Sequence, residues 1–252
     1  MDKIPEVVQN QPLETLKGCK GYYACPQCPD GRLLGPLVGY AGQYDAPDGT
    51  KKHFVGRVYY NFAMAEQWPH LLTFFANGVR VAMRSRMSDD SYTSLFVGAP
   101  MGGIRLAGEL GRVYGKRAIF AEKKVTAAAT GNQREKSMLV WGRHSPEAGD
   151  HVVLVEDLVN NYSTTAELVA LVEQAGAEVI AVACAINRSP EDHYHAPDGR
   201  EIPVASYLHI PTEQFKQEDP AVAEYIAAGQ ICWKPKLEWV KLEAAMANAK
   251  AD

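Results

Sequence analysis

Two adjacent carboxylates, Glu156 and Asp157, follow directly on the apolar run VVLV that begins at Val152. The run is rich in β-branched residues and predicts a buried strand. In parallel sheets, ligands bind at the carboxyl ends of the strands. The acid pair is therefore a candidate for contact with a polar ligand, the alternative being that both side chains are simply solvated.

The segment after the acids is polar and leads into a predicted helix, TAELVALVEQAGA, which Gly176 is expected to end. The first turn of a helix offers backbone N–H groups and partial positive charge, which suits a phosphate group. Thr164 is expected to cap this helix, with Glu167 completing a capping box. Capping alone is the alternative explanation of the hydroxyl residues.

Strand and helix patterns alternate through the part of the chain that surrounds these residues. Helical spacing of apolar residues occurs over 65–85 and 102–115, and strand patterns occur over 94–100, 116–124, 151–159 and 178–188. This alternation predicts an α/β fold, with a Rossmann-like parallel sheet covered by helices on both faces. Residues 1–50 are rich in Cys, Gly and Pro and are predicted to form a separate segment, followed by the main domain over 51–252.

Composition narrows the class of function. The chain has 252 residues, a net charge of -4 and a pI of about 6.0, which disfavours general binding to nucleic acid. No apolar run reaches the roughly 18–20 residues of a membrane span, and the polar start of the chain is unlike a signal peptide. We therefore expect a cytoplasmic protein without membrane partners.

The five cysteines are an odd number, which argues against a disulfide framework. Cys25 and Cys28 form a C-x-x-C turn, and Cys19 precedes it. Two alternatives stand for these three residues: a structural Zn²⁺ site that needs a fourth ligand from elsewhere, or free thiols in a tight turn. Cys184 lies in a predicted buried strand and is assigned to the core.

The strand, the acid pair and the hydroxyl-containing loop together resemble the ribose-phosphate signature of type I phosphoribosyltransferases. Other segments resemble further parts of that family in the same order: VYYNFAMAE, FVGAPMGGIRLAGELG (the pyrophosphate loop), AIFAEKK, AINR and ICWKPKLEW. As a set they are most similar to the orotate branch. The resemblance implies the type I phosphoribosyltransferase fold, with a small hood formed by the N- and C-terminal segments.

The resemblance also implies a role for individual residues. Glu156 and Asp157 would bind the ribose hydroxyls of phosphoribosyl pyrophosphate (PRPP), and Lys123, Lys124 and Asp157 would be the catalytic residues. The 5-phosphate loop would consist of Asn160, Asn161, Tyr162, Ser163, Thr164 and Thr165. The pyrophosphate site would consist of Gly98, Ala99, Pro100, Met101, Gly102, Gly103 and Arg105. The base would be bound by Lys51, Tyr59, Tyr60 and Arg188.

The implied reaction is displacement of pyrophosphate from the anomeric carbon of PRPP by a ring nitrogen of a nucleobase. It requires Mg²⁺ to neutralise the diphosphate and a mobile loop to exclude water. The segment VTAAATGNQREKS, with Gly131, Arg134 and Lys136, is the expected lid. By the same resemblance the protein would be a homodimer.

Two departures from the family pattern leave the substrate open. The 5-phosphate loop reads NNYST instead of TTGGS, so Tyr162 places bulk at a glycine position, and Gly102 stands where many orotate enzymes have lysine. Three hypotheses follow: an orotate phosphoribosyltransferase, an enzyme of the same fold that uses another base, or a non-catalytic regulator that senses PRPP or a nucleotide.

Overall fold

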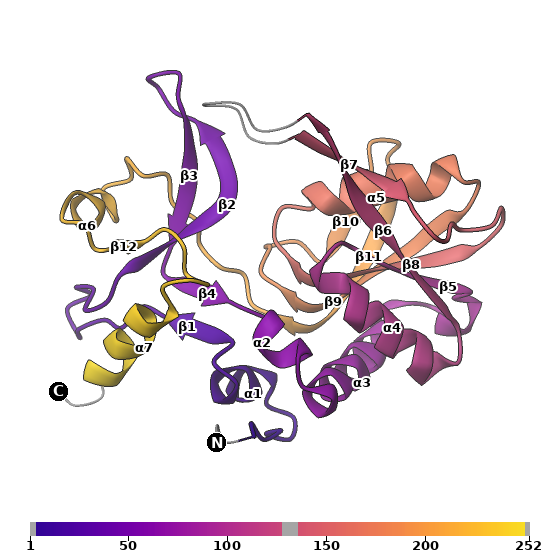
Figure 1. Ribbon diagram of the computed structural model, residues 1–252, viewed down its shortest axis with the longest axis horizontal. Coiled ribbons are helices and arrows are strands. Elements are labelled where there is room, and N and C mark those ends of the chain that lie inside the picture. Colours follow the sequence, from indigo (N-terminus) through magenta and orange to yellow (C-terminus); the bar gives the residue numbers. More distant parts are fainter. Residues whose placement is uncertain (1–3, 128–135, 250–252) are drawn as a thin grey trace. The chain divides into compact units, whose positions relative to one another are not determined.

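The computed structural model describes residues 4–127 and 136–249 (Figure 1). The chain divides into two compact units, one formed by residues up to 15 together with 65–211, the other by 16–64 together with 212 onward. The second unit thus joins an N-terminal to a C-terminal segment. The functional boundary expected at residue 50 is not tested by this division and stays a prediction.

The first unit is built on a seven-stranded sheet with the order β10-β11-β9-β8-β5-β6-β7. Its parallel strands are β5 (Leu95–Gly98), β6 (Arg117–Ala127), β8 (His151–Val159), β9 (Glu178–Asn187) and β11 (Glu201–His209). Antiparallel strands β7 (Lys136–Trp141) and β10 (His193–His195) form the two edges. The predicted parallel sheet is confirmed.

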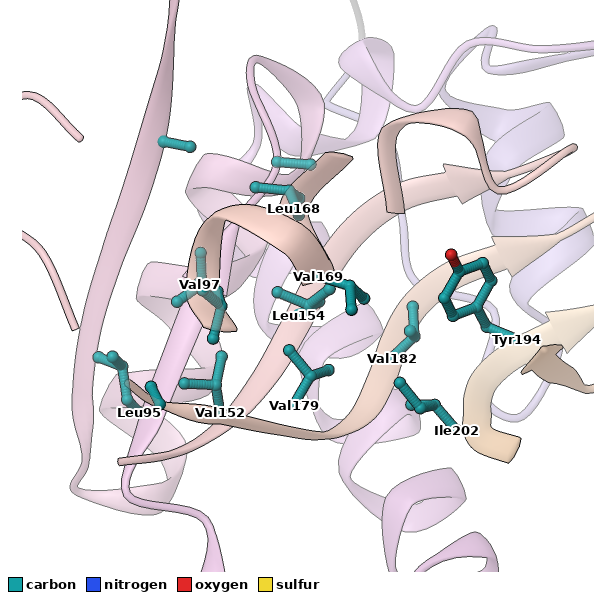
Figure 2. Close-up of a cluster of buried hydrophobic side chains, with 14 of the residues drawn as sticks. Leu95, Val97, Val152, Leu154, Leu168, Val169, Val179, Val182, Tyr194 and Ile202 are labelled. Carbon is teal, nitrogen blue, oxygen red and sulfur yellow. The ribbon is translucent and has the colours of Figure 1, made fainter. Parts of the chain in front are cut away.

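Helices cover both faces of this sheet, as predicted (Figure 1). The helices α3 (Pro69–Arg86) and α4 (Gly102–Tyr114) contact one another and pack on one face, and α5 (Ser163–Gln174) packs on the other. Figure 2 shows Leu168 and Val169 of α5 against Val152 and Leu154 of β8, in the core of that second face. Burial of these aliphatic side chains is the main force that holds α5 to the sheet.

One helix begins later than the sequence pattern suggests. The pattern runs from residue 65, whereas a short helix α2 (Ala63–Glu66) ends before α3 starts at Pro69. Trp68, directly before the proline, is extended with φ -103° and ψ 110°. A proline ring disfavours helical torsions in the residue before it, so the chain breaks here and restarts with Pro69 in the first helical position.

The second unit has its own core, formed by residues including Tyr23, Leu37, Val55 and Leu242. It contains a two-stranded sheet of β1 (Tyr22–Ala24) and β4 (Val58–Tyr60), and a three-stranded sheet with the order β12-β2-β3. The remaining bounds are α1 (Pro12–Gly18), β2 (Leu37–Asp45), β3 (Lys51–Gly56), η1 (Asp90–Tyr92, in the first unit), α6 (Ala223–Ala227), β12 (Ile231–Cys232) and α7 (Trp239–Asn248). Within the described ranges, no helix is long and apolar enough to cross a membrane.

Candidate functional site

The acid-bearing strand and the small-residue loop lie against each other at the carboxyl ends of β5 and β8. Gly98 pairs with Val155, and the Ala99 amide donates a 2.8 Å hydrogen bond to the Val155 carbonyl. A Cβ atom placed on Gly102 would lie 2.2 Å from the carboxyl carbon of Asp157. The Asp157 carboxylate therefore lies against the first residue of α4, and a side chain at Gly102 would require that carboxylate to move.

Gly103 is restricted by the backbone of β8. A Cβ atom on Gly103 would lie 2.0 Å from the Val155 carbonyl oxygen, so α4 starts in direct contact with the backbone of β8. Of the other residues predicted for the pyrophosphate site, Ala99 is buried and Pro100 half-buried, whereas Met101 and Arg105 are exposed. The structure thus brings the predicted pyrophosphate loop and Asp157 together.

The two acids themselves have different surroundings, because successive side chains of a strand point to opposite faces. Glu156 continues the row of Val152 and Leu154 on the α5 face and is buried, with 9% exposure. Burial, and secondarily the charge of Asp157, raises the pKa of Glu156 to about 8, although Lys123 acts in the opposite direction. Near neutral pH, Glu156 is therefore mostly protonated.

The two predicted catalytic lysines occupy neighbouring positions in β6. Lys123 pairs with Leu139 and Lys124 with Met138, and both lysines are exposed. Lys123 lies near enough to Glu156 to affect its pKa, which places Lys123 in the surroundings of the acids. Lys124 points to the other face of the strand by alternation.

The lid predicted after these lysines lies largely outside the described residues. Positions 128–135, with Gly131 and Arg134, are outside them, and so is the side chain of Lys136. The described ends of the segment belong to the β6–β7 ladder. The lid stays a prediction.

The 5-phosphate loop is a short connection between β8, which ends at Val159, and α5, which begins at Ser163. The cap of α5 was predicted wrongly: Tyr162, not Thr164, is the N-cap, and its side chain makes no capping bond. The Asn161 Oδ1 accepts from the Ser163 amide at 3.3 Å and from its hydroxyl at 3.0 Å. Such an Asx turn competes with a conventional cap.

The remaining loop residues lie around these. Asn160 and Thr164 are half-buried, and Thr165 is buried in the first turn of α5. The Tyr162 side chain extends to the turn between β9 and β10, where its hydroxyl donates to the Glu191 carbonyl at 2.9 Å. Its bulk is accommodated there, packed against the core beneath α5.

Arg188 follows β9 and is buried, with 4% exposure. Its backbone amide donates a 2.9 Å hydrogen bond to the carbonyl of Val159, the last residue of the acid-bearing strand. The structure therefore places Arg188 beside the predicted 5-phosphate loop. Asn187 and Ser189, both buried and hydrogen-bonded to each other, were not foreseen, because only the fold brings this turn to Tyr162.

The other three residues predicted to bind the base belong to the second unit. Lys51 forms an exposed ion pair with Asp45 at 2.7 Å. Tyr60 is buried, with its ring centroid 5.3 Å from that of Tyr22, and Tyr59 packs against the core of the unit. Their part in binding a base stays a prediction.

The structure does not bring the N-terminal cysteines together as a zinc site. The described residues contain no group of three or more His, Cys, Asp or Glu side chains that could hold a metal ion. The Cys25 thiol instead bonds the Gly35 carbonyl at 3.1 Å, and the Cys19 thiol bonds the Leu16 carbonyl at 3.3 Å. Burial raises the pKa of Cys19 to about 11, which opposes the thiolate form that zinc requires. Cys28 is also a free thiol.

The chain is similar in sequence to two orotate phosphoribosyltransferases. No family model matches the chain. The orotate phosphoribosyltransferase of Chlorobaculum parvum is 29% identical over 145 residues, covering 56% of this chain and 67% of that protein. The orotate phosphoribosyltransferase of Carboxydothermus hydrogenoformans is 29% identical over 131 residues, covering 52% of this chain and 62% of that protein.

Two solved structures are distantly similar to this chain. Adenine phosphoribosyltransferase from Rhodothermus marinus aligns with a TM-score of 0.47 and 18% identity, covering 79% of this chain and 99% of that one. Orotate phosphoribosyltransferase from Aeropyrum pernix aligns with a TM-score of 0.45 and 15% identity, covering 68% and 87% of the two chains. These likenesses are too distant to add to the sequence comparison.

The similarity in sequence and the geometry of the site agree with one another. The parallel sheet brings the acid pair, the predicted pyrophosphate loop over residues 98–103 and the start of α5 to the carboxyl ends of its strands. Both of the relatives described above are orotate phosphoribosyltransferases. The chain is therefore similar in sequence to orotate phosphoribosyltransferases, in agreement with the resemblance that its motifs show to the type I phosphoribosyltransferase family.

Proposed function

We propose that this protein transfers a phosphoribosyl group from PRPP to a nucleobase, with orotate as the acceptor and pyrophosphate as the second product. The observation that carries the proposal is the contact between the Asp157 carboxylate and Gly102 at the start of α4. A sugar held at the acid and a diphosphate held at the small-residue loop would then be adjacent, as they are in PRPP.

The acid pair supplies two kinds of hydrogen-bonding group for the ribose. Asp157 lies half-exposed at the loop and provides carboxylate oxygens that accept from sugar hydroxyls. Glu156, with its pKa raised to about 8 by burial, keeps a proton near neutral pH and can donate as well as accept. Negative charge at Asp157 also favours the positive charge that develops on the sugar ring.

The phosphate groups of PRPP would occupy two helix starts. The 5-phosphate would lie at the start of α5, over residues 160–165, and the diphosphate at residues 98–103 before α4. Both are the positive ends of helix dipoles, which favour anions. Lys123 would add a positive charge near the leaving diphosphate.

The residues of this site fit a magnesium ion that is held partly by the phosphate groups of PRPP. Mg²⁺ is commonly bound by one or two carboxylates together with substrate phosphates. The described residues include no cluster of three or more ligands for an ion held by the protein alone, whereas Asp157 offers one carboxylate beside the pyrophosphate loop. When bound there, the ion would neutralise charge on the leaving diphosphate.

Orotate is the acceptor supported by the two curated relatives, both orotate phosphoribosyltransferases. Orotate is anionic, and the cationic Arg188 beside the acid-bearing strand suits such a base. Lys51, Tyr59 and Tyr60 are the other residues that we propose to bind the base. Use of another base remains the second hypothesis, because the Tyr162 loop departs from the family pattern.

The test has two stages. PRPP is first titrated with Mg²⁺ while the unfolding temperature is followed, since a ligand that binds only the folded state raises it. Pyrophosphate release is then assayed with orotate, uracil, adenine, hypoxanthine and guanine.

Each outcome selects one hypothesis. Release with orotate supports the proposal, and release with a different base alone assigns the chain to that base. Stabilisation without release from any base identifies a regulator that binds PRPP. A chain that PRPP neither stabilises nor reacts with lacks the proposed function altogether.

The assembly is a separate proposal. We propose a homodimer, as the family resemblance implies, and sedimentation equilibrium over a range of concentrations tests it. A single species at the mass of one 27.6 kDa chain throughout that range would refute it.

A further inference from the structure

Tyr162 holds a backbone conformation that a side chain normally disfavours. Its torsions are φ 57° and ψ 15°, in the left-handed region, directly before the first residue of α5. A Cβ atom clashes with the backbone in this region, which is why glycine usually occupies it. The chain therefore tolerates an unfavourable conformation at the centre of the predicted 5-phosphate loop, and other interactions must maintain it.

The side chain of Tyr162 supplies such interactions. Its hydroxyl oxygen lies 3.0 Å from Ser189 Oγ and donates to the Glu191 carbonyl at 2.9 Å. Its ring lies 5.7 Å from the ring of Tyr194, centroid to centroid. The anchor thus combines two polar contacts with an aromatic one, all on the segment that follows β9.

The anchoring turn is itself fixed. Asn187 is fully buried, and its Oδ1 accepts from the Ser189 amide at 2.9 Å and from the Ser189 hydroxyl at 2.8 Å. Its Nδ2 donates to the Glu191 carbonyl at 2.8 Å. The atoms to which Tyr162 bonds are therefore held by a buried amide and have little freedom to follow the loop if it moves.

The same turn also holds the other end of the loop. The Arg188 amide donates to the carbonyl of Val159, which directly precedes Asn160. The connection between β8 and α5 is thus tied at Val159 by a backbone bond and at Tyr162 by a side chain, both to the turn over residues 188–191. A glycine at position 162 would leave only the first tie.

We propose that Tyr162 is a positioning residue, whose anchored side chain holds the loop over residues 160–163 in the conformation that binds the 5-phosphate of the sugar donor. This inference rests on the proposed function. In place of the backbone freedom of glycine, the chain uses a fixed left-handed residue. Loop order would then exist before the ligand arrives, and binding would lose less conformational entropy.

The test compares the wild type with Tyr162→Phe, Tyr162→Gly and Ser189→Ala, and with the double variant Tyr162→Phe/Ser189→Ala. The matched control is Tyr194→Phe, which removes a hydroxyl from the adjacent ring that makes none of these bonds. Calorimetry gives the Kd for PRPP and for ribose 5-phosphate, steady-state kinetics gives kcat and both KM values, and amide hydrogen exchange reports on residues 160–166 without ligand.

We expect Tyr162→Phe and Ser189→Ala each to raise the Kd and KM for PRPP by about three- to tenfold, the range of one hydrogen bond. The double variant should lose less affinity for PRPP than the two single losses added together, because the Tyr162–Ser189 contact is common to both changes. Loop amides should exchange faster, while the KM for the base stays near its wild-type value. A residue that only supports overall folding would alter both KM values together.

Tyr162→Gly separates anchoring from simple bulk. An anchor predicts weaker PRPP binding in this variant, although glycine adopts the left-handed torsions without a clash. Tighter binding in Tyr162→Gly, or unchanged binding in Tyr162→Phe, would overturn the inference. A wild-type chain that binds neither ligand would instead remove the proposed function itself, so the two failures are told apart by the wild type alone.

Discussion

Glu156 and Asp157 are neighbours in the sequence but occupy different environments in the fold. Glu156 is enclosed with the aliphatic side chains beneath α5, whereas Asp157 is half-exposed against Gly102. The reason is the two-residue period of a strand, which directs adjacent side chains to opposite faces. The two acids are therefore expected to contribute differently, and one variant of each distinguishes them.

Asp157→Asn keeps the size of the side chain and removes its charge. We expect turnover to fall by roughly 10²–10³-fold, the scale of one lost electrostatic contact to a transition state, with the unfolding temperature close to that of the wild type. Steady-state kinetics with PRPP and the accepted base measures this. Asp198→Asn, in an exposed turn, is the control, and unchanged turnover in Asp157→Asn would contradict the role of Asp157.

Glu156→Gln tests the effect of burial on a carboxyl group. Because burial raises the folded pKa of Glu156 to about 8, above an unfolded value of about 4.3, the folded state retains a proton that the unfolded state releases between these values. This contribution to stability is complete below the unfolded pKa and is lost as the pH rises through the folded pKa.

The variant should not lose stability in this way. From about pH 5 to about pH 8, the free energy of unfolding of Glu156→Gln should rise relative to wild type by on the order of 3 kcal/mol. Urea unfolding at both pH values measures it. Glu167→Gln, an exposed change on α5, should follow the wild type, and parallel profiles for Glu156→Gln would show that the carboxyl is ionised in the fold.

At the scale of elements, the start of α4 determines where Asp157 lies. Gly102 and Gly103 both contact β8, one through the Asp157 side chain and the other through the Val155 carbonyl. Small residues there allow helix and strand to approach closely, which aligns the positive end of the α4 dipole with the strand ends. A side chain at Gly103 would separate the two elements, whereas one at Gly102 would displace the Asp157 carboxylate.

Gly102→Ala would place a Cβ atom 2.2 Å from the Asp157 carboxyl carbon, so the carboxylate must move. We expect activity to fall by at least about tenfold, since misplacement by about 1 Å can cost more than that. The control is Gly108→Ala on the same helix, where no atom lies within 4 Å of the added Cβ.

Gly108→Ala should leave activity intact and add up to about 1 kcal/mol of stability, because alanine favours a helix interior over glycine. Chemical denaturation and kinetics of both variants measure the contrast. Equal activity in Gly102→Ala and wild type would mean that Asp157 does not need its observed position.

At the scale of the whole molecule, the cysteines provide a test of how the chain is stabilised. Four of the five are buried and Cys28 is half-exposed, all as free thiols. We expect one fast-reacting thiol in the folded protein and five after unfolding, as counted with Ellman's reagent. A chelator should leave the unfolding temperature unchanged, whereas a zinc-dependent fold would lose stability.

The sequence already contained the sheet and most of its helices. The apolar runs of β5, β8 and β9 and the helical spacing of α4 and α5 identified these elements, because local periodicity reports which faces are buried. The acid pair and the small-residue loop were also identified, and the order of strand and helix determined that both lie at the carboxyl ends of strands.

Tertiary structure alone decided how these residues meet. No local pattern indicates that Asp157 rests on Gly102, that Glu156 is enclosed enough to hold a proton, or that Tyr162 bonds a turn 27 residues further along the chain. Such contacts join segments distant in sequence. They depend on strand order, side-chain volume and exclusion of water, and these arise only when the whole sheet is assembled and covered.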